Sequence, residues 1–141
     1  MTNQPFKILV VEDEEGPRLA LAELLRLDGF EVLTARDGED GYQQAVASEP
    51  DLIITDLVMP VLDGLELVRL IRRQGGRLNA IPIIALSANL GDYNLTSRMN
   101  SGINRFLNKP VNDYRSLATT IRFLLGQQDE QQATVLSATQ R

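Results

Sequence analysis

The chain has 141 residues, with 14 Lys and Arg against 19 Asp and Glu, and its net charge of −5 suits one acidic domain of ordinary size. It contains no cysteine and no histidine, which excludes disulfides, thiolate or imidazole metal ligands, and Ser-His-Asp catalysis. The acidic balance argues against direct binding of nucleic acid, and no apolar run reaches the roughly 18 residues of a membrane span. Carboxylates, hydroxyls and lysine are left to carry the chemistry.

Five short apolar runs alternate with segments that have helical spacing. The runs are rich in Val, Ile, Leu or Phe, and the first, third and fourth are nearly continuous, as in strands buried on both faces of a parallel sheet. The predicted strands are Ile8–Val11, Val32–Ala35, Leu52–Thr55, Ile83–Leu86 and Arg105–Leu107.

Four of the intervening segments carry apolar stripes bounded by capping residues and helix breakers. These predicted helices lie between Pro17 and Asp28, between Asp37 and Pro50, between Asp63 and Gly75, and between Asp113 and Gly126.

Two further segments lack a clear stripe. Gly91–Gly102 is rich in Asn, Ser, Thr and Gly, which are weak helix formers, so it predicts a marginal helix and the most mobile element. Residues 127–141 are polar and without clear periodicity, and they predict a tail or linker stump after a domain of residues 1–126.

The alternation of strands and helices predicts an α/β fold with an open, doubly wound sheet of five parallel strands. Right-handed crossovers favour a flavodoxin-like (βα)5 arrangement with strand order 2-1-3-4-5.

Polar residues follow four of the predicted strands where ligands bind in such sheets, beyond the carboxyl ends. Glu12 and Asp13 follow the first strand, Asp56 the third, Ser87 the fourth and Lys109 the fifth. Any one of these acids could be only a helix cap, but crowded carboxylates also favour a hard divalent cation such as Mg²⁺. Together with a lysine and a hydroxyl they could hold a phosphoryl group, with Asp56 as the nucleophile that forms an acyl phosphate.

The segments 8–15, 51–64, 81–88 and 105–111 resemble the receiver domain of two-component response regulators, and the resemblance covers roughly residues 6–126. It implies that Asp56 is the phosphoacceptor. It also implies that Glu12, Asp13, Asp56 and the backbone carbonyl of Val58 are the Mg²⁺ ligands. Glu12 stands where aspartate is more usual, so its contact with the metal is expected to run through water.

The same resemblance implies roles for residues around the phosphoacceptor. Ser87, in place of the commoner threonine, would be the switch hydroxyl, and Lys109 the phosphate-binding lysine, often joined to its proline by a cis bond. Phe106 falls on the aromatic switch position. Val58 and Asn89 occupy positions that modulate the lifetime of the phosphorylated state.

A receiver of this kind is a phosphoacceptor switch rather than an enzyme, with intrinsic autophosphotransfer and autodephosphorylation. The resemblance implies a bacterial, cytoplasmic phosphorelay protein, and residues 1–6 show no secretory signal. The expected partners are a sensor histidine kinase or a histidine phosphotransfer protein, and a downstream protein target or output domain. Membrane insertion is not expected, and a homodimer through the 88–125 face is one arrangement such a switch allows.

Other classes of function remain as alternatives. A pseudo-receiver would bind partners without phosphorylation, and the chain could instead be the receiver fragment of a hybrid histidine kinase. An aspartate-nucleophile phosphatase needs a second acid two residues after the nucleophile, where this sequence has Val58. A flavodoxin-like electron carrier needs a phosphate-binding loop after the first strand, where four acids stand.

Overall fold

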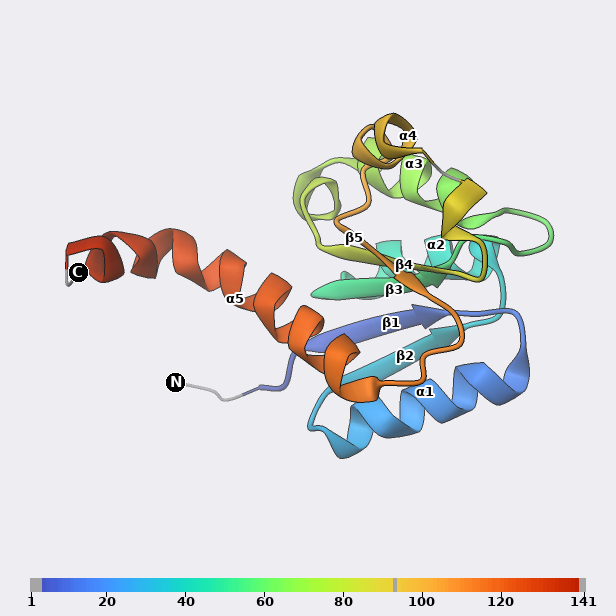
Figure 1. The fold of residues 1–141 in the computed structure, drawn as a ribbon, viewed down its shortest axis with the longest axis horizontal. Coiled ribbons are helices and arrows are strands. Elements are labelled where there is room, and N and C mark those ends of the chain that lie inside the picture. Colours follow the sequence, from blue (N-terminus) through green and yellow to red (C-terminus); the bar gives the residue numbers. More distant parts are fainter. Residues whose placement is uncertain (1–3, 93, 140–141) are drawn as a thin grey trace. The chain divides into compact units, whose positions relative to one another are not determined.

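The structure, a computed structural model, describes residues 4–92 and 94–139 and contains one sheet of five parallel strands (Figure 1). Each strand agrees with its predicted counterpart to within one residue at either end. The strands are β1 (Lys7–Val11), β2 (Glu31–Ala35), β3 (Leu52–Asp56), β4 (Ile83–Ser87) and β5 (Arg105–Asn108). Their order in the sheet is β2-β1-β3-β4-β5, which confirms the predicted flavodoxin-like fold.

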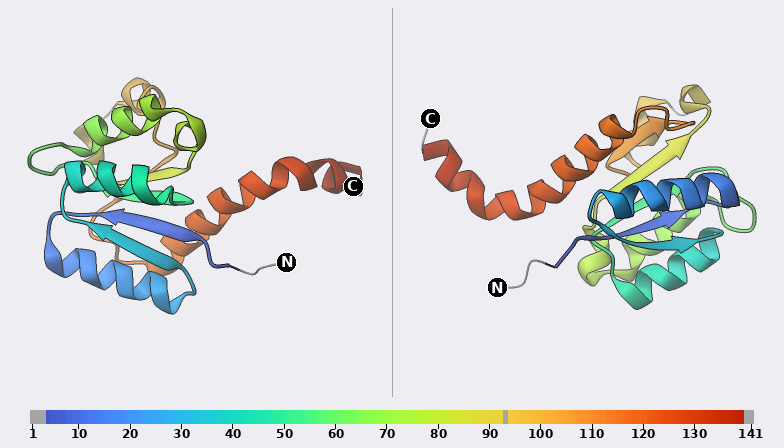
Figure 2. Two further views of the ribbon diagram at one scale, coloured as in Figure 1. Left: turned by 180° about the vertical axis from the view of Figure 1, so that it is seen from behind. Right: turned by 90° about the horizontal axis from the view of Figure 1, so that it is seen from below.

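Helices cover both faces of this sheet. Helix α1 (Glu15–Leu27) lies on one face, and α2 (Gly38–Ser48) and α3 (Gly64–Gln74) lie on the other (Figures 1 and 2). The predicted caps are confirmed: the Asp37 carboxylate accepts a hydrogen bond from the Asp40 N–H at 2.8 Å, and Asp63 accepts one from Glu66 at 2.9 Å. Each cap satisfies an N–H that the first helical turn leaves unpaired.

The core lies between the central strands and the helices. Strands β3 and β4 are buried along their whole length, as their continuous apolar sequence predicts. Leu9 and Ile53 of the sheet belong to one buried cluster with Ala45 of α2 and with Leu67 and Ile71 of α3. This packing holds the carboxyl ends of β1 and β3 rigidly side by side.

The segment after β4 is less regular than one helix. It forms a single 3₁₀ turn, η2 (Leu90–Asp92), and a short helix, α4 (Leu95–Met99). Weak helix formers on both sides of Leu95–Met99 account for the short length of α4. A second 3₁₀ turn, η1 (Gly76–Asn79), follows α3.

The remaining residues, Val111–Arg141, form a second compact unit. Its helix α5 (Tyr114–Thr139) begins after Asp113, whose carboxylate accepts hydrogen bonds from the Ser116 hydroxyl at 2.7 Å and the Arg115 N–H at 3.1 Å. The hydrogen bonds donated by Ser116 lower the pKa of Asp113.

The predicted end of the last helix at Gly126 is wrong, because α5 continues through this glycine to Thr139. A glycine costs a helix about 1 kcal/mol, and the Gln-, Glu- and Ala-containing sequence that follows favours helix. The division into a domain of residues 1–126 and a tail stays a prediction. Among the residues that the structure describes, none of the helices combines the length and apolar character of a membrane span.

Candidate functional site

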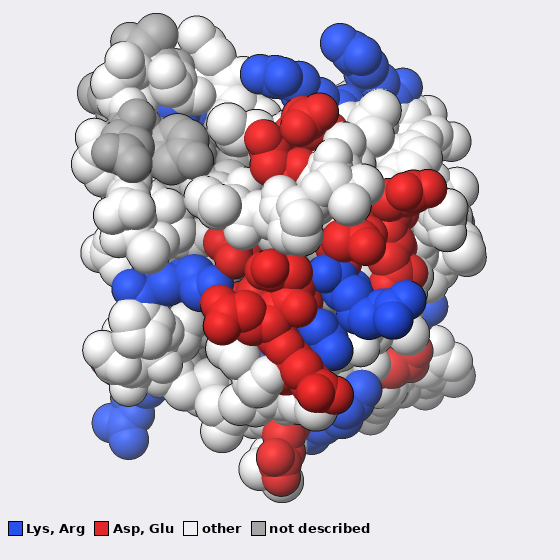
Figure 3. Space-filling view, turned by 90° about the vertical axis from the view of Figure 1, so that its right-hand side faces the viewer, with Lys and Arg blue, Asp and Glu red and all other residues white. Residues whose placement is uncertain are grey.

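Acidic side chains gather at the edge of the sheet where the strands end, as the space-filling view of that side shows (Figure 3). Glu12 and Asp13 follow β1 directly, and Asp56 is the last residue of β3. Each offers a carboxylate oxygen, and these three oxygens lie within 4.8 Å of one another. Glu12 and Asp56 are each only 5% exposed, whereas Asp13 is exposed. The cluster therefore has two buried acids and one acid open to solvent.

Lys109 joins the two buried acids. Its ammonium donates to Glu12 Oε1 at 2.7 Å and to Asp56 Oδ2 at 2.9 Å. Burial by itself would lower the pKa of Lys109, but the hydrogen bonds and charges of Glu12 and Asp56 outweigh burial and raise that pKa to about 12. Burial raises the pKa of Glu12, against the lowering effect of its hydrogen bonds from Lys109 and from the Glu14 N–H. Lys109 thus remains positively charged at the centre of the site.

The donor set suits a hard divalent cation. All three side chains offer carboxylate oxygens, which Mg²⁺ prefers, and exposed Asp13 leaves a route for a hydrated ion. Ligand oxygens on one Mg²⁺ ion lie about 3–4 Å apart, given metal–oxygen distances of about 2.1 Å, so only small side-chain movements are needed. Lys109 supplies one positive charge against three acids, which leaves net negative charge for a cation to neutralise.

The loop after β3 carries Asp56 and is tightly constrained. The Val58 N–H donates to Asp56 Oδ1 at 3.3 Å, and the Gly64 N–H donates to the Leu57 carbonyl at 2.9 Å. A Cβ on Gly64 would lie 2.3 Å from the Asp56 carbonyl oxygen, so only glycine lets α3 start this close to the site. Val61 in the same loop has φ of 71°, a left-handed conformation that is rare for β-branched residues.

The predicted switch hydroxyl lies at the end of the neighbouring strand. Ser87 is buried, and its hydroxyl oxygen accepts a hydrogen bond from the Asn89 N–H at 3.1 Å. Asn89 itself is exposed. No hydrogen bond joins Ser87 or Asn89 to Asp56 among the described residues. The Lys109–Pro110 bond is cis.

Phe106, the predicted aromatic switch, is half-buried on β5 and has a partner that the sequence did not indicate. The Arg98 guanidinium of α4 lies over its ring, 5.6 Å from the ring centroid. Arg98 also donates to the Leu90 carbonyl at 2.5 Å. No sequence pattern pairs these residues, because their contact depends on the path of the chain around α4.

Arg18 is a second site residue that sequence reasoning missed. Its guanidinium donates to the backbone carbonyl of Glu12 at 3.0 Å, with a longer contact to the Asp13 carbonyl at 3.5 Å. Arg18 therefore stabilises the loop that contains Glu12 and Asp13. Its position in the sequence could have indicated this contact. Arg18 lies about one helical turn after the acidic run that begins at Glu12, and a side chain in the first turn of a helix can reach back to the loop before it.

Comparison with known proteins places this arrangement in a family. A family model described as the response regulator receiver domain matches residues 8–122. The chain belongs to this family. The comparison confirms the resemblance predicted from the segments around the site.

Curated relatives include bacterial transcriptional regulators. The transcriptional regulatory protein AfsQ1 of Streptomyces coelicolor is 37% identical over 118 residues, which cover 84% of this chain and 50% of the relative. The alkaline phosphatase synthesis transcriptional regulatory protein PhoP of Bacillus subtilis is 36% identical over 104 residues, which cover 74% of this chain and 42% of the relative. The chain spans about half the length of these relatives.

Solved structures include close matches of domain size. The receiver domain of sensor histidine kinase PA1611 from Pseudomonas aeruginosa, with a magnesium ion coordinated in its active-site cleft, has a TM-score of 0.78 and 30% identity. It covers 86% of this chain and 98% of its own. The chemotaxis protein CheY4 of Vibrio cholerae has a TM-score of 0.76 and 28% identity, covering 85% of this chain and 98% of its own.

Proposed function

We propose that this chain is an active receiver that accepts a phosphoryl group on Asp56. The observation that carries the proposal is the Lys109 ammonium held between two buried carboxylates, 2.7 Å from Glu12 and 2.9 Å from Asp56. A surface acid that only caps a helix does not need such a partner. Membership of the receiver family supports this assignment of roles.

The chemistry is the transfer of a phosphoryl group from a nitrogen or oxygen atom of the donor to a carboxylate oxygen of Asp56. One carboxylate oxygen of Asp56 bonds to phosphorus, the bond from phosphorus to the donor breaks, and the leaving group takes the electron pair. Lys109, already 2.9 Å from Asp56, would donate to an oxygen of the transferred group. Mg²⁺ bound by Glu12, Asp13, Asp56 and the Val58 carbonyl would supply positive charge against the phosphoryl oxygens.

Two side chains border the route of the water that later hydrolyses the acyl phosphate. Val58 follows Asp56 by two residues and is 70% exposed, so it presents an apolar surface beside the site. Asn89 is exposed at the end of β4, where its amide could orient a water. We therefore assign Val58 and Asn89 to control of the lifetime of the phosphorylated state.

The signal would leave through the segment after β4. A dianionic group on Asp56 draws the Ser87 hydroxyl toward it, which exchanges the hydrogen bond from Asn89 for one to the phosphoryl group. This movement leaves space beside β4 that Phe106 can enter. Arg98 links Phe106 to α4 and to Leu90, so α4 would respond as well.

The proposal extends to partners in general terms. The phosphoryl donor would be a sensor histidine kinase or a histidine phosphotransfer protein, in line with membership of the receiver family. The signal would pass to a downstream protein or an output domain. The surface that switches would lie in residues 88–125, and it could also form a homodimer. We place this exchange in the cytoplasm of a bacterium, in line with the bacterial relatives.

Intact-protein mass measurement tests the proposal. With Mg²⁺ and a small phosphodonor such as acetyl phosphate, we expect the chain to gain the mass of one phosphoryl group. Asp56→Asn should gain none, because the amide is not a nucleophile here. Asp63→Asn is the matched control and should be labelled normally, since asparagine also caps α3.

Each alternative predicts a different result. Labelling of Asp56→Asn would refute the assignment of the phosphoacceptor. Absence of labelling in the parent chain would instead favour a pseudo-receiver that acts by binding.

A further inference from the structure

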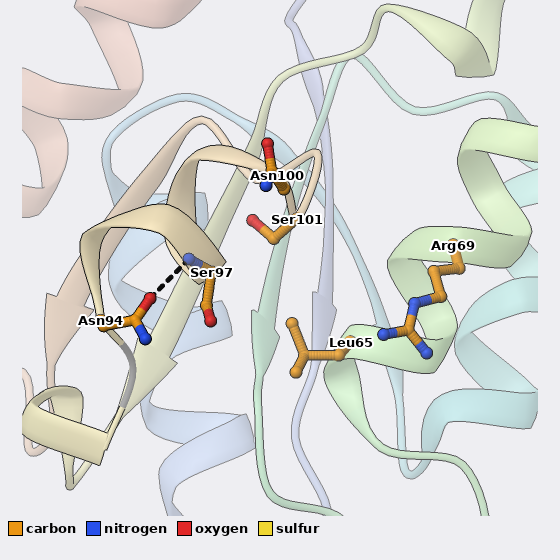
Figure 4. Close-up of a pocket in the computed structure, with 6 residues that line it drawn as sticks. All are labelled: Leu65, Arg69, Asn94, Ser97, Asn100 and Ser101. Carbon is orange, nitrogen blue, oxygen red and sulfur yellow. Dashed lines mark hydrogen bonds between the residues drawn. The ribbon is translucent and has the colours of Figure 1, made fainter.

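A polar cavity lies between α3 and α4, within the first compact unit of the chain (Figure 4). Its volume is about 330 Å³, at the lower end of the range of small-molecule sites, which is about 300–1,000 Å³. Leu65 and Arg69 line it from α3. The opposite wall consists of residues in and around α4, namely Asn94, Ser97, Asn100 and Ser101.

Three polar side chains of this cavity have no partner among the described residues. The guanidinium of Arg69 makes no ion pair and no hydrogen bond among the described residues. The Ser97 hydroxyl and the Asn100 amide also have no hydrogen-bond partner in the described part of the chain. In Figure 4, Leu65 and Arg69 extend from α3 toward the α4 wall.

Hydrogen bonds fix the two walls in place. The Asn94 side chain accepts from the Ser97 N–H at 2.7 Å, and the Ser101 hydroxyl donates to the Arg98 carbonyl at 2.7 Å. Arg72 of α3 donates to the Gly102 carbonyl at 2.7 Å, directly after the α4 wall. The cavity is therefore preformed, which lowers the entropy lost when a ligand binds.

We infer that this cavity is a binding site for a small organic anion whose carboxylate or phosphate group pairs with Arg69. A guanidinium binds either oxyanion through two parallel N–H donors, and the Ser97 hydroxyl and the Asn100 amide supply further donors at the opposite wall. The side chain of Leu65 offers an apolar contact for the rest of the ligand. The site is separate from the acidic cluster, whose negative charge repels anions when no metal is bound. The inference does not depend on phosphorylation of Asp56.

Backbone-resolved NMR titration with inorganic phosphate tests the inference. The titration is run on metal-free protein, without added Mg²⁺ and at constant ionic strength, so that the acidic cluster does not bind the probe. We expect saturable shifts at the amides of Ser97, Asn100 and Ser101. In Arg69→Gln the half-saturating concentration should rise about tenfold, because a charge-assisted hydrogen bond is lost.

Arg73→Gln is the matched control, since it removes the same charge from an exposed residue of α3 that does not line the cavity. It should leave the titration unchanged. Ser97→Ala should weaken binding by a smaller factor, through loss of one neutral donor. Equal half-saturation in Arg69→Gln and the parent, or shifts centred on Asp56 and Lys109, would overturn the inference.

A second titration with N-acetylglutamate identifies the oxyanion that the site prefers. Saturation by this probe at the same amides, with the same loss in Arg69→Gln, would show that a carboxylate is accepted. Saturation by phosphate alone would restrict the ligand to phosphate esters. Failure of both probes to saturate would refute an anion site between α3 and α4.

Discussion

At the scale of single residues, Lys109 supplies the positive charge that the two buried carboxylates of Glu12 and Asp56 require. Glu12 and Asp56 are almost fully buried, and both are bonded to this ammonium. An unpaired buried charge is far more costly than a paired one. Lys109 and a bound divalent cation would therefore both neutralise the same acidic side chains. A cation should partly offset the loss of the positive charge of Lys109.

Replacing Lys109 by methionine tests this relation. We expect Lys109→Met to lower the free energy of unfolding by about 1–3 kcal/mol without Mg²⁺, because two buried acids lose their counter-charge. Mg²⁺ should then stabilise the variant more than the parent. Urea unfolding with and without Mg²⁺ measures both effects. Lys109→Arg keeps the charge and is the control; a Mg²⁺ response equal to that of the parent in Lys109→Met would contradict the argument.

Val58 offers a second test at this scale, and it rests on Asp56 being the phosphoacceptor. Its exposed apolar side chain cannot hydrogen-bond a water that approaches the acyl phosphate. Val58→Asn introduces a group that can, so dephosphorylation should become faster by up to about tenfold, or about 1.4 kcal/mol of barrier. The decay of labelled protein after removal of the donor gives the rate. An unchanged rate would mean that Val58 does not border the path of the water.

At the scale of elements, the start of α3 depends on the absence of a side chain at Gly64. A Cβ there would meet the Asp56 carbonyl oxygen at 2.3 Å and the Leu57 Cα at 2.8 Å. Both neighbours are backbone atoms, which cannot rotate away as the end of a flexible side chain can. The close approach ties the position of α3 to that of the candidate phosphoacceptor.

Gly64→Ala should therefore lower the free energy of unfolding by about 1–3 kcal/mol or more, as overpacked sites do. Chemical denaturation of the variant measures this loss. Gly16→Ala in α1 is the matched control, because nothing lies within 4 Å of the added Cβ. It should be neutral or stabilising by up to about 1 kcal/mol. Equal stability of the two variants would show that the loop after β3 yields easily.

The contact between α4 and β5 can be measured by a double-mutant cycle. Arg98→Met, Phe106→Leu and the double variant should show a coupling of about 0.5–1 kcal/mol in urea unfolding, the usual strength of an exposed cation–π contact. A coupling indistinguishable from zero would mean that Arg98 holds α4 through its other contacts, such as its hydrogen bond to the Leu90 carbonyl. In that case Phe106 would be free to change its orientation without moving Arg98.

For the molecule as a whole, the sequence predicts best what depends on local pattern. The apolar runs predict the five strands that the structure describes. The rule that ligands bind beyond the carboxyl ends of parallel strands predicts that Glu12, Asp13, Asp56 and Lys109 lie together, as they do. Arg18 and Arg98 escaped prediction because each acts through contacts set by tertiary structure. The end of α5 was misplaced because Gly126 is tolerated where its neighbours favour helix.

The segment after β4 is the part of the molecule best suited to change with phosphorylation. It contains one 3₁₀ turn and a helix of five residues, whereas α1 has 13 residues and a helical stripe buried on the sheet. Short helices flanked by weak helix formers open at little cost. A single charged group can shift an equilibrium only between states that are already close in energy.

We therefore expect hydrogen exchange to report where the phosphorylation signal leaves the molecule. On addition of Mg²⁺ and a phosphoryl analogue, the largest changes in amide exchange should fall within residues 88–108. This range begins directly after Ser87 and includes Phe106, the two residues that we expect to move. Helices α1 and α2 should change little, because neither contains Ser87 or Phe106. Asp56→Asn with the same additions is the control and should show no change. If the changes were confined to residues 12–26 instead, the output would lie on α1, and the assignment of Phe106 as the switch would be wrong.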